Sequence, residues 1–329
     1  MNDMELIVDN YLLYKIITGS HLYGTNTENS DNDYSGVFLE PFEYIASPFK
    51  NIEEINLSVP NKDVSGKNTF LAVDVKYYGL KRFIKLVSQC NPNIIEFLFV
   101  PDNKILYLSN DFKSILDNRE LFLTQEIARR FMGYAFEQEK KMYIRSENFT
   151  LIHQAWKSLK EEYPNLPQNT PIMKTKTADK YLESTRFLHQ HNPDNAEYLY
   201  KCGDLQFGTT LHIKKVMKML SERIQKASHR TDMILHKGYD YKFASHVVRL
   251  LGEGYQLMTE HTITFPIINV DDVIDIKRGL YTIDRVKEII DNWKEKFRYA
   301  EERCDLPPKG SNLNKIEQLT WKIQRNWYE

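Results

Sequence analysis

Features of secreted, membrane-spanning and zinc-binding proteins are scarce in this sequence. It has three cysteines, Cys90, Cys202 and Cys304, which lie far apart and lack the close spacing of metal ligands. No apolar run approaches the roughly 20 residues that a membrane-spanning helix requires, and residues 1–15 contain neither a basic leader nor a cleavable apolar core. We therefore expect a cytoplasmic protein with no membrane partner.

A net charge of either sign is also lacking. Lysine plus arginine number 44 and aspartate plus glutamate number 45, so any polyanion must be bound by a local basic patch and not by overall charge. Charged residues make up 27% and hydrophobic residues 42% of the chain, which is typical of a globular protein. A length of 329 residues is enough for a sizeable core and for two domains.

The hydrophobic pattern changes along the chain. β-Branched and aromatic runs predict strands, and longer runs with helical periodicity predict helices. The predicted strands span 11–18, 34–39 and 69–75. The predicted helices span 77–88, 122–145, 178–190, 209–228, 241–259, 282–303 and 312–323, with a proline-rich loop at 161–171. We therefore predict an α+β fold, in which a small mixed β-sheet with flanking helices precedes a mostly helical C-terminal body.

Two aspartates that follow a glycine-serine pair form the motif that carries chemistry. Gly19-Ser20 ends the first predicted strand, and Asp31-Asn32-Asp33 comes after ten intervening residues. Side chains two positions apart in an extended segment lie on the same face, so we expect Asp31 and Asp33 to face one cation. Carboxylates suit Mg²⁺, with Mn²⁺ as the alternative, and glycine lets backbone N–H groups approach a triphosphate.

Asp74, at the end of the third predicted strand, is the candidate for a third carboxylate at this site. It would help to hold a second metal ion, as in two-metal nucleotidyl transfer. Other roles are open for all three acids. Asp31 and Asp33 could satisfy backbone groups in a polar turn, and Asp74 could stabilise the N-terminus of the following helix.

In these residues the chain resembles the DNA polymerase β-like nucleotidyltransferase superfamily, whose signature is Gly-Ser, a spacer, Asp-x-Asp and a later acid. It is most similar to a predicted nucleotidyltransferase family that includes RNA-repair-associated bacterial members and uncharacterised proteins of large phages. The similar stretches are 19–24, 30–38, 74–98 and 238–251. Residues 140–229 resemble nothing that we can place, so they are where we expect the acceptor to be chosen.

The resemblance implies a nucleotidyltransferase catalytic domain over 1–120 and a helical domain over 121–329 that completes the active-site cleft and binds the acceptor. It also implies roles for single residues. The implied metal ligands and catalytic acids are Asp31, Asp33 and Asp74. The implied nucleotide-binding residues of the first motif are Gly19, Ser20 and His21.

A polar stripe is predicted on the helix that begins near residue 241. Asp240 is the expected N-terminal cap, and Lys242, Ser245, His246 and Arg249 share one helical face. Lys242, His246 and Arg249 would contact the nucleotide, since lysine and arginine neutralise phosphate charge. A solvated face with a satisfied histidine is the alternative interpretation.

A second basic stretch lies on the helix predicted at 209–228. Lys214, Lys215 and Lys218 would contact RNA or DNA there, or would face solvent. Elsewhere, Glu96 lies in a run that is otherwise apolar and should be paired because an unpaired buried charge is costly. Its expected partner is Lys81 or Arg82.

Three functions are open on sequence grounds. The first is Mg²⁺-dependent transfer of a nucleoside monophosphate from a nucleoside triphosphate to a hydroxyl, with release of pyrophosphate. The acceptor would be an RNA end, such as that of a tRNA, a protein or a small molecule. The second is a catalytically silent nucleotide-binding or interaction protein. The third is a metal-dependent phosphohydrolase that uses water as the acceptor.

Overall fold

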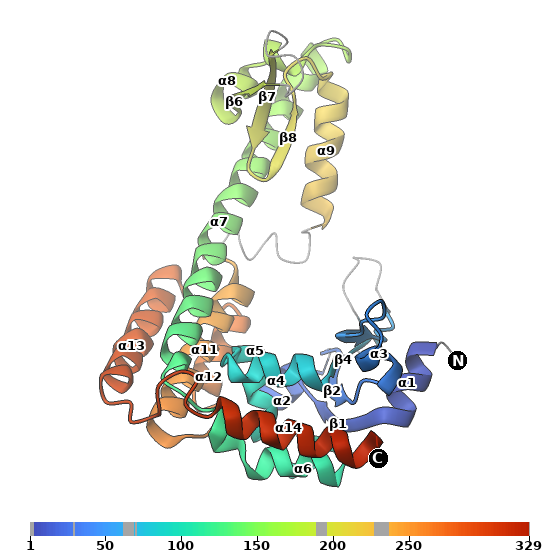
Figure 1. Ribbon diagram of the computed structural model, residues 1–329. Helices are drawn as coiled ribbons and strands as arrows, with labels where there is room; N and C mark the ends of the chain where they lie inside the picture. The colour runs from blue at the N-terminus through green and yellow to red at the C-terminus, as the bar shows by residue number, and fades with distance from the viewer. Residues whose placement is uncertain are drawn as a thin grey trace. The chain divides into compact units, whose positions relative to one another are not determined.

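The computed structural model describes residues 3–28, 30–61, 69, 71–188, 196–226 and 237–328. The chain forms two compact units (Figure 1). The first unit comprises Met1–Gln138, Ser245–Leu280 and Asp284–Glu329, and the second comprises Glu139–Ala244 and Tyr281–Ile283. In sequence, the main segment of the second unit, Glu139–Ala244, is therefore an insertion into the first.

The first unit contains a five-stranded mixed sheet with the order β3-β4-β2-β1-β5. β2 and β4 are parallel, and the other neighbours are antiparallel. The strands are β1 (Leu12–Ile17), β2 (Asn32–Phe38), β3 (Glu54–Asn56), β4 (Val73–Gly79) and β5 (Ile105–Leu108). Leu13, Tyr14 and Ile16 of β1 are fully buried, which fixes the strand's register because a slip would expose them.

Helices make up most of the rest of the first unit. They are α1 (Asp3–Tyr11), α2 (Gly19–Tyr23), α3 (Phe42–Ala46), α4 (Leu80–Ser88), α5 (Pro92–Ile95), α6 (Asn110–Asp117), α12 (Val270–Lys277), α13 (Ile283–Glu302) and α14 (Leu313–Tyr328). The long helices α7 (Glu126–Glu162) and α11 (Tyr241–Glu260) contain residues of both units. α14 packs beside α4 and α6 (Figure 1). None of the helices in the described part of the chain is long and apolar enough to cross a membrane.

Aromatic side chains fill the core between the sheet and the helices α4 and α6. The rings of Tyr14 and Phe112 are stacked with centroids 4.4 Å apart, and Phe83 lies 5.4 Å from Phe112. The Tyr14 hydroxyl donates a hydrogen bond of 3.1 Å to the carbonyl oxygen of Phe97. Burial raises the pKa of Tyr14 well above its usual range. The core therefore ties β1 to the segment that follows α5.

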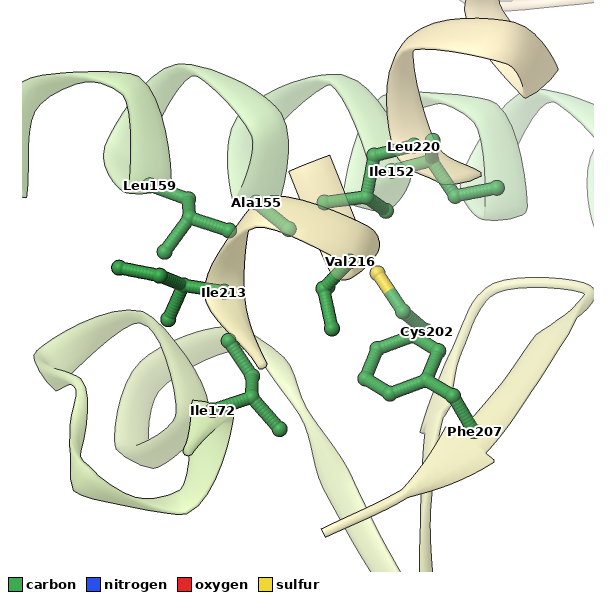
Figure 2. Close-up of a cluster of buried hydrophobic side chains, with 9 residues drawn as sticks. All are labelled: Ile152, Ala155, Leu159, Ile172, Cys202, Phe207, Ile213, Val216 and Leu220. Carbon is green, nitrogen blue, oxygen red and sulfur yellow. The ribbon is translucent and has the colours of Figure 1, made fainter. Parts of the chain in front are cut away.

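The second unit has its own sheet and its own core. Its elements include α8 (Lys176–Tyr181), β6 (Glu183–Leu188), β7 (Ala196–Cys202), β8 (Leu205–Gly208) and α9 (Ile213–Lys226). β6, β7 and β8 form an antiparallel sheet in that order. Figure 2 shows Leu159 of α7 beside Ile213 of α9, with Val216 close to Phe207 of β8.

The predicted α+β fold, with a mixed N-terminal sheet and a mostly helical body, is confirmed. The helix predicted at 178–190 is wrong: α8 ends at Tyr181 and β6 follows it, and residues 189 and 190 lie outside the described residues. β6 is a strand because it pairs with β7, a non-local interaction that overrides local periodicity.

The third predicted strand also needs correction. β4 starts at Val73 and extends to Gly79, so residues 77–79 are strand and not helix, because they pair with β2. Asp74 consequently lies near the beginning of this strand and not at its end. The predicted division at residue 120 differs from the observed units, because the C-terminal helix α14 packs on α4 and α6 of the N-terminal part.

Candidate active site

Three strands of the first unit meet at a cavity of about 330 Å³. β1 is antiparallel to β2, so the end of β1 lies beside the beginning of β2. β4 is parallel to β2 and begins at the same edge of the sheet. The cavity is lined, among others, by Gly19, Asn56, Asp33, Asp74, Lys76 and Glu96.

Gly19 and Asp33 are in unusually close contact at this cavity. Gly19 has a φ of +63°, a left-handed conformation that side chains disfavour. A Cβ added to it would lie 2.0 Å from Oδ2 of Asp33, a distance that no side chain tolerates. The backbone N–H of Thr18 also donates a 2.9 Å hydrogen bond to the Asp33 carbonyl oxygen. Only glycine at position 19 therefore allows this carboxylate to lie against the turn.

Asp33 and Asp74 are direct partners in the parallel register of β2 and β4. Side chains at such positions project from the same face of a sheet, with strands about 4.8 Å apart, and both aspartates line the cavity. The Ser58 hydroxyl makes a very short contact with Oδ1 of Asp74 and lies 2.5 Å from Oδ1 of Asn56. It also accepts a 3.1 Å hydrogen bond from the backbone N–H of Val75. Ser58 thereby orients one carboxylate of the pair.

Asp31 precedes β2 and is half-buried, and it is not among the described residues that line the cavity. Within the part of the chain that the structure describes, no three acidic, histidine or cysteine side chains are close enough to hold a metal ion. Asp31, Asp33 and Asp74 therefore do not gather around one point, and the register instead pairs Asp33 with Asp74. A two-carboxylate site still fits Mg²⁺, which usually takes one or two carboxylates and completes its shell with water and substrate phosphates.

Lys76 supplies a positive charge to the same cavity. Its ammonium lies 2.8 Å from Glu54 of β3 and 4.9 Å from the centre of the Tyr78 ring. Burial alone would lower the pKa of Lys76, but the hydrogen bond and charge of Glu54 outweigh burial and raise the pKa. Lys76 is therefore held in its charged form two residues after Asp74.

A buried polar network forms another wall of the cavity. Arg249 Nη1 donates hydrogen bonds of 2.9 and 3.0 Å to the oxygens of Glu253 and lies 3.4 Å from Glu96. The Tyr23 hydroxyl donates to Glu96 and lies 2.9 and 3.0 Å from its two carboxylate oxygens. The Arg249 guanidinium lies 4.5 Å from the centre of the Tyr23 ring. The ion-pair partner expected for Glu96, Lys81 or Arg82, is wrong, because Glu96 pairs with Arg249 of α11. Arg249 lies far from Glu96 in the sequence, so local spacing does not reveal the contact.

Two acids share one guanidinium in this network. Burial raises the pKa of Glu96 to about 8, although Arg249 opposes that change, and the neighbouring Glu253 adds to it. Burial likewise raises the pKa of Glu253 and of the Tyr23 hydroxyl. The physical cause is that one positive charge cannot fully stabilise two carboxylates that are shielded from water. One of the two acids therefore retains a proton well above its usual range.

The remaining predicted nucleotide-binding residues are placed as follows. Ser20 follows Gly19 in α2, and its carbonyl oxygen accepts a 3.0 Å hydrogen bond from Thr25. His21 is half-buried, and its Nε2 has no hydrogen-bond partner among the described residues. Lys242 is exposed in the second unit, whereas His246 is half-buried in the first. None of the four is among the described residues that line the cavity.

Arg249 is only 7% exposed, and its guanidinium is engaged by the two glutamates. It contacts Tyr23 and Glu96, which line the cavity, so it orients the wall and is not itself a lining residue. Asp240 caps α11 as expected, because its Oδ1 accepts a 3.0 Å hydrogen bond from the backbone N–H of Lys242. Lys214, Lys215 and Lys218 all lie in the second unit, on α9.

The N-terminal half of the chain is similar in sequence to a known family. Residues 2–159 match the family described as the RNA repair pathway DNA polymerase beta family. The predicted resemblance to nucleotidyltransferases of the DNA polymerase β type is confirmed. The match includes three of the four similar stretches, 19–24, 30–38 and 74–98, and with them Gly19, Asp33 and Asp74, but it does not reach the fourth at 238–251.

Individual relatives were also found. An uncharacterized 38.9 kDa protein from the nrdC-mobD intergenic region of Enterobacteria phage T4 is 25% identical over 341 aligned positions, which cover 97% of this chain and 95% of the phage protein. A nucleotidyltransferase-like protein from Exiguobacterium sibiricum 255-15, known from a crystal structure, aligns with 98% of this chain and 77% of its own at 8% identity. Its TM-score is 0.26, so this structural likeness supports no conclusion.

Several residues at the cavity were missed by sequence analysis. Ser58 and Asn56 come from β3 and the turn after it, and β3 has only three residues, which is too short to produce a periodic signal. Lys76 follows Asp74 by two positions, and it would have been a candidate had the strand been placed correctly. Glu96 and Tyr23 were in motif stretches, but their meeting with Arg249 depends on tertiary packing.

Proposed function

We propose that the chain transfers a nucleoside monophosphate from a nucleoside triphosphate to a hydroxyl acceptor. The observation that carries this proposal is the pairing of Asp33 with Asp74 across β2 and β4, beside a glycine turn that permits close backbone approach. The match of residues 2–159 to a DNA polymerase beta family supports it. The acceptor oxygen would attack the α-phosphorus, the bond from that phosphorus to the β-phosphate bridging oxygen would break, and pyrophosphate would leave.

Asp33 and Asp74 would hold Mg²⁺, which neutralises charge on the transferred phosphoryl group when bound. Asp31 would support them from the residue before β2. Asp74 would also take the proton of the acceptor hydroxyl, and the contact with Ser58, which orients its carboxylate, supports this role. Lys76, held in its charged form by Glu54, would contact a non-bridging phosphate oxygen.

The Gly-Ser turn would hold the phosphates through its backbone N–H groups. Gly19 would come closest, because it lines the cavity directly. Ser20 and His21 would support it from the following residues of α2. His246, which lies in the first unit, would contact the bound nucleotide away from the reacting atoms, so His246→Ala should raise KM more than it lowers kcat.

The test is incubation with each α-³²P-labelled nucleoside triphosphate, Mg²⁺, and total cellular RNA and protein, followed by identification of the labelled product. Asp33→Asn should reduce labelling by a factor on the order of 100 or more, the usual loss when one transition-state charge contact is removed. The double variant Asp31→Asn with Asp33→Asn should abolish it while the circular dichroism spectrum is unchanged. Asp117→Asn, at an exposed acid that ends α6, is the matched control.

Other outcomes identify the alternatives. Release of pyrophosphate without a labelled product would indicate a phosphohydrolase. Binding of the triphosphate with no turnover in any fraction would indicate a silent nucleotide-binding protein. Full labelling by a folded Asp33→Asn, Asp74→Asn double variant would contradict the assigned site.

A further inference from the structure

The second unit presents a basic surface that the proposed active site does not use. α9 is amphipathic, and its buried residues Ile213, Val216 and Leu220 follow one face of the helix. They pack against Ala155 and Leu159 of α7, as Figure 2 shows. Because this face is fixed in the core, the opposite face must point to solvent.

That opposite face carries three exposed lysines, Lys214, Lys215 and Lys218. Two backbone hydrogen bonds join the start of α9 to residues that precede α8. The N–H of Ile213 donates to the carbonyl oxygen of Thr170 at 2.9 Å, and the N–H of Ile172 donates to the carbonyl oxygen of Leu211 at 2.8 Å. The loop that precedes Thr170 is therefore held beside the first turn of the helix.

The loop and the helix enclose a hollow of about 400 Å³. It is lined by Gln168 and Asn169 from the loop and by His212 and the three lysines from the helix side. No acidic side chain is among the lining residues in the described part of this unit. Glu222 of α9 is 3.8 Å from Lys218, and Asp204, in the turn between β7 and β8, is paired with Arg223.

We propose that this lysine hollow binds the phosphate backbone of single-stranded RNA that serves as the acceptor. The proposal rests on the proposed function, which requires an acceptor with a free hydroxyl. The chain as a whole has a net charge of −1, so three lysines on one helix face form a local field that overall charge does not supply. RNA fits better than a protein because the lysines are point charges suited to successive phosphates.

The two amides on the loop add a second kind of contact. Gln168 and Asn169 can donate to and accept from 2′-hydroxyls and the edges of unpaired bases. Paired bases do not offer those edges in the deep, narrow major groove of an RNA duplex, which is why the proposal specifies a single strand. His212 lies between the amides and the lysines in the sequence and can offer its ring to a base.

The direct test is fluorescence anisotropy of a labelled 20-nucleotide single-stranded RNA with the full chain, over a range of salt concentrations. The association constant falls as salt rises, and each lysine–phosphate contact on a single strand contributes about 0.7 to the steepness of log K against log salt. The triple variant Lys214→Gln, Lys215→Gln, Lys218→Gln should therefore make this dependence shallower by about 2. If the variant and the natural chain bind equally at 1 M salt, the variant should bind roughly 100-fold more weakly at 0.1 M. The matched control is Lys157→Gln, Lys176→Gln and Lys180→Gln, which removes the same charge from exposed positions of the same unit outside the hollow.

Two further arms identify the ligand. Gln168→Ala with Asn169→Ala should reduce the preference for RNA over DNA of the same sequence while the salt slope stays the same. Single-stranded DNA, polyglutamate and inorganic tripolyphosphate should each compete less well than unlabelled RNA. Equal competition by any of them, or an equal loss in the two lysine triples, would overturn the proposal. Circular dichroism of each variant excludes unfolding as the cause.

Failure here is separable from failure of the proposed function. Asp33→Asn should bind RNA with unchanged affinity, because Asp33 belongs to the first unit. If RNA binds through the lysines but no label is transferred to any acceptor, the proposed function fails and the hollow stands. If label is transferred to RNA with equal efficiency by the lysine variant, the hollow fails and the enzymatic proposal stands.

Discussion

At the scale of single residues, the contact of Gly19 with Asp33 constrains the site most tightly. The left-handed φ and the 2.0 Å approach of an added Cβ act at the same position. Either one alone disfavours a side chain, and together they exclude it without movement of Asp33. The glycine of the Gly-Ser motif therefore determines where the carboxylate lies, in addition to leaving room for phosphates.

Gly19→Ala should consequently impair both stability and transfer. The left-handed conformation costs roughly 1–2 kcal/mol for alanine, and displacement of Asp33 should lower kcat by more than 10-fold on the order-of-magnitude scale of misplaced catalytic groups. The control is Gly133→Ala in α7, where an added Cβ meets nothing within 4 Å. Alanine should stabilise that helix position by roughly 0.5–1 kcal/mol. Thermal melting and labelled-product assays measure both effects, and a Gly19→Ala protein with normal activity would contradict the close contact.

At the scale of elements, the short strand β3 and the turn after it support the site from outside the signature motif. Ser58 contacts Asp74, and Glu54 of β3 holds Lys76. These contacts follow from the antiparallel pairing of β3 with β4. The strand therefore supplies orientation and charge to a site whose named acids come from its neighbours.

Ser58→Ala should weaken the apparent affinity for Mg²⁺ by about 10–100-fold, the usual effect of removing a group that orients a metal-binding carboxylate. The readout is the Mg²⁺ concentration that gives half-maximal transfer. Ser58→Thr keeps the hydroxyl and should restore most of the effect, whereas Ser221→Ala on α9 controls for the substitution itself. An unchanged Mg²⁺ titration in Ser58→Ala would argue against a positioning role.

The elements also show what the sequence was able to predict. α9, α11 and α13 were found near their observed bounds because each has a strong apolar period over its length, and β1 was found from its β-branched and aromatic residues. β4 was displaced because residues 77–79, predicted as helix, pair with β2. β6 was predicted as helix because its pairing with β7 overrides its local periodicity, whereas β7 and β8 form a local hairpin around Gly203-Asp204 that was not recognised. Asp33 and Gly19 were identified from spacing alone, whereas Ser58 and Lys76 depended on register.

At the scale of the whole molecule, the ion pair of Arg249 with Glu96 joins positions 153 residues apart. Sequence spacing cannot predict such a contact, since either residue has many charged candidates for a partner. The pair connects η1 (Glu96–Phe99) with α11. It therefore joins the part of the first unit that precedes the insertion in sequence to the part that follows it. Its protonation should influence the stability of the unit as a whole.

The stability of the protein should therefore depend on pH through Glu96. The folded-state pKa is raised to about 8, above the ordinary carboxyl value. The contribution of protonated Glu96 to the free energy of unfolding is fully present at pH values below the ordinary carboxyl pKa. It is lost as pH rises from there through about 8, at no more than about 1.4 kcal/mol per pH unit. Glu96→Gln cannot titrate, so it should become more stable relative to the natural chain as pH rises from about 5 to 8. Arg249, Glu253 and Tyr23 face the same carboxyl and remain in both proteins.

Urea unfolding at closely spaced pH values measures this difference. Glu137→Gln, at an exposed acid of α7, controls for the loss of one negative charge. A constant difference between Glu96→Gln and the natural chain across this pH range would show that Glu96 titrates normally in the folded state.

The insertion of the second unit between residues 138 and 245 has an evolutionary consequence. A segment with its own core and its own sheet can be exchanged or remodelled over generations while Gly19, Asp33 and Asp74 keep their strands and their spacing. Descendants of one ancestral enzyme would then differ in the molecules they modify while sharing one chemistry. Lineages that diverge most within this insert and least around the three motif residues are the record that such a history would leave.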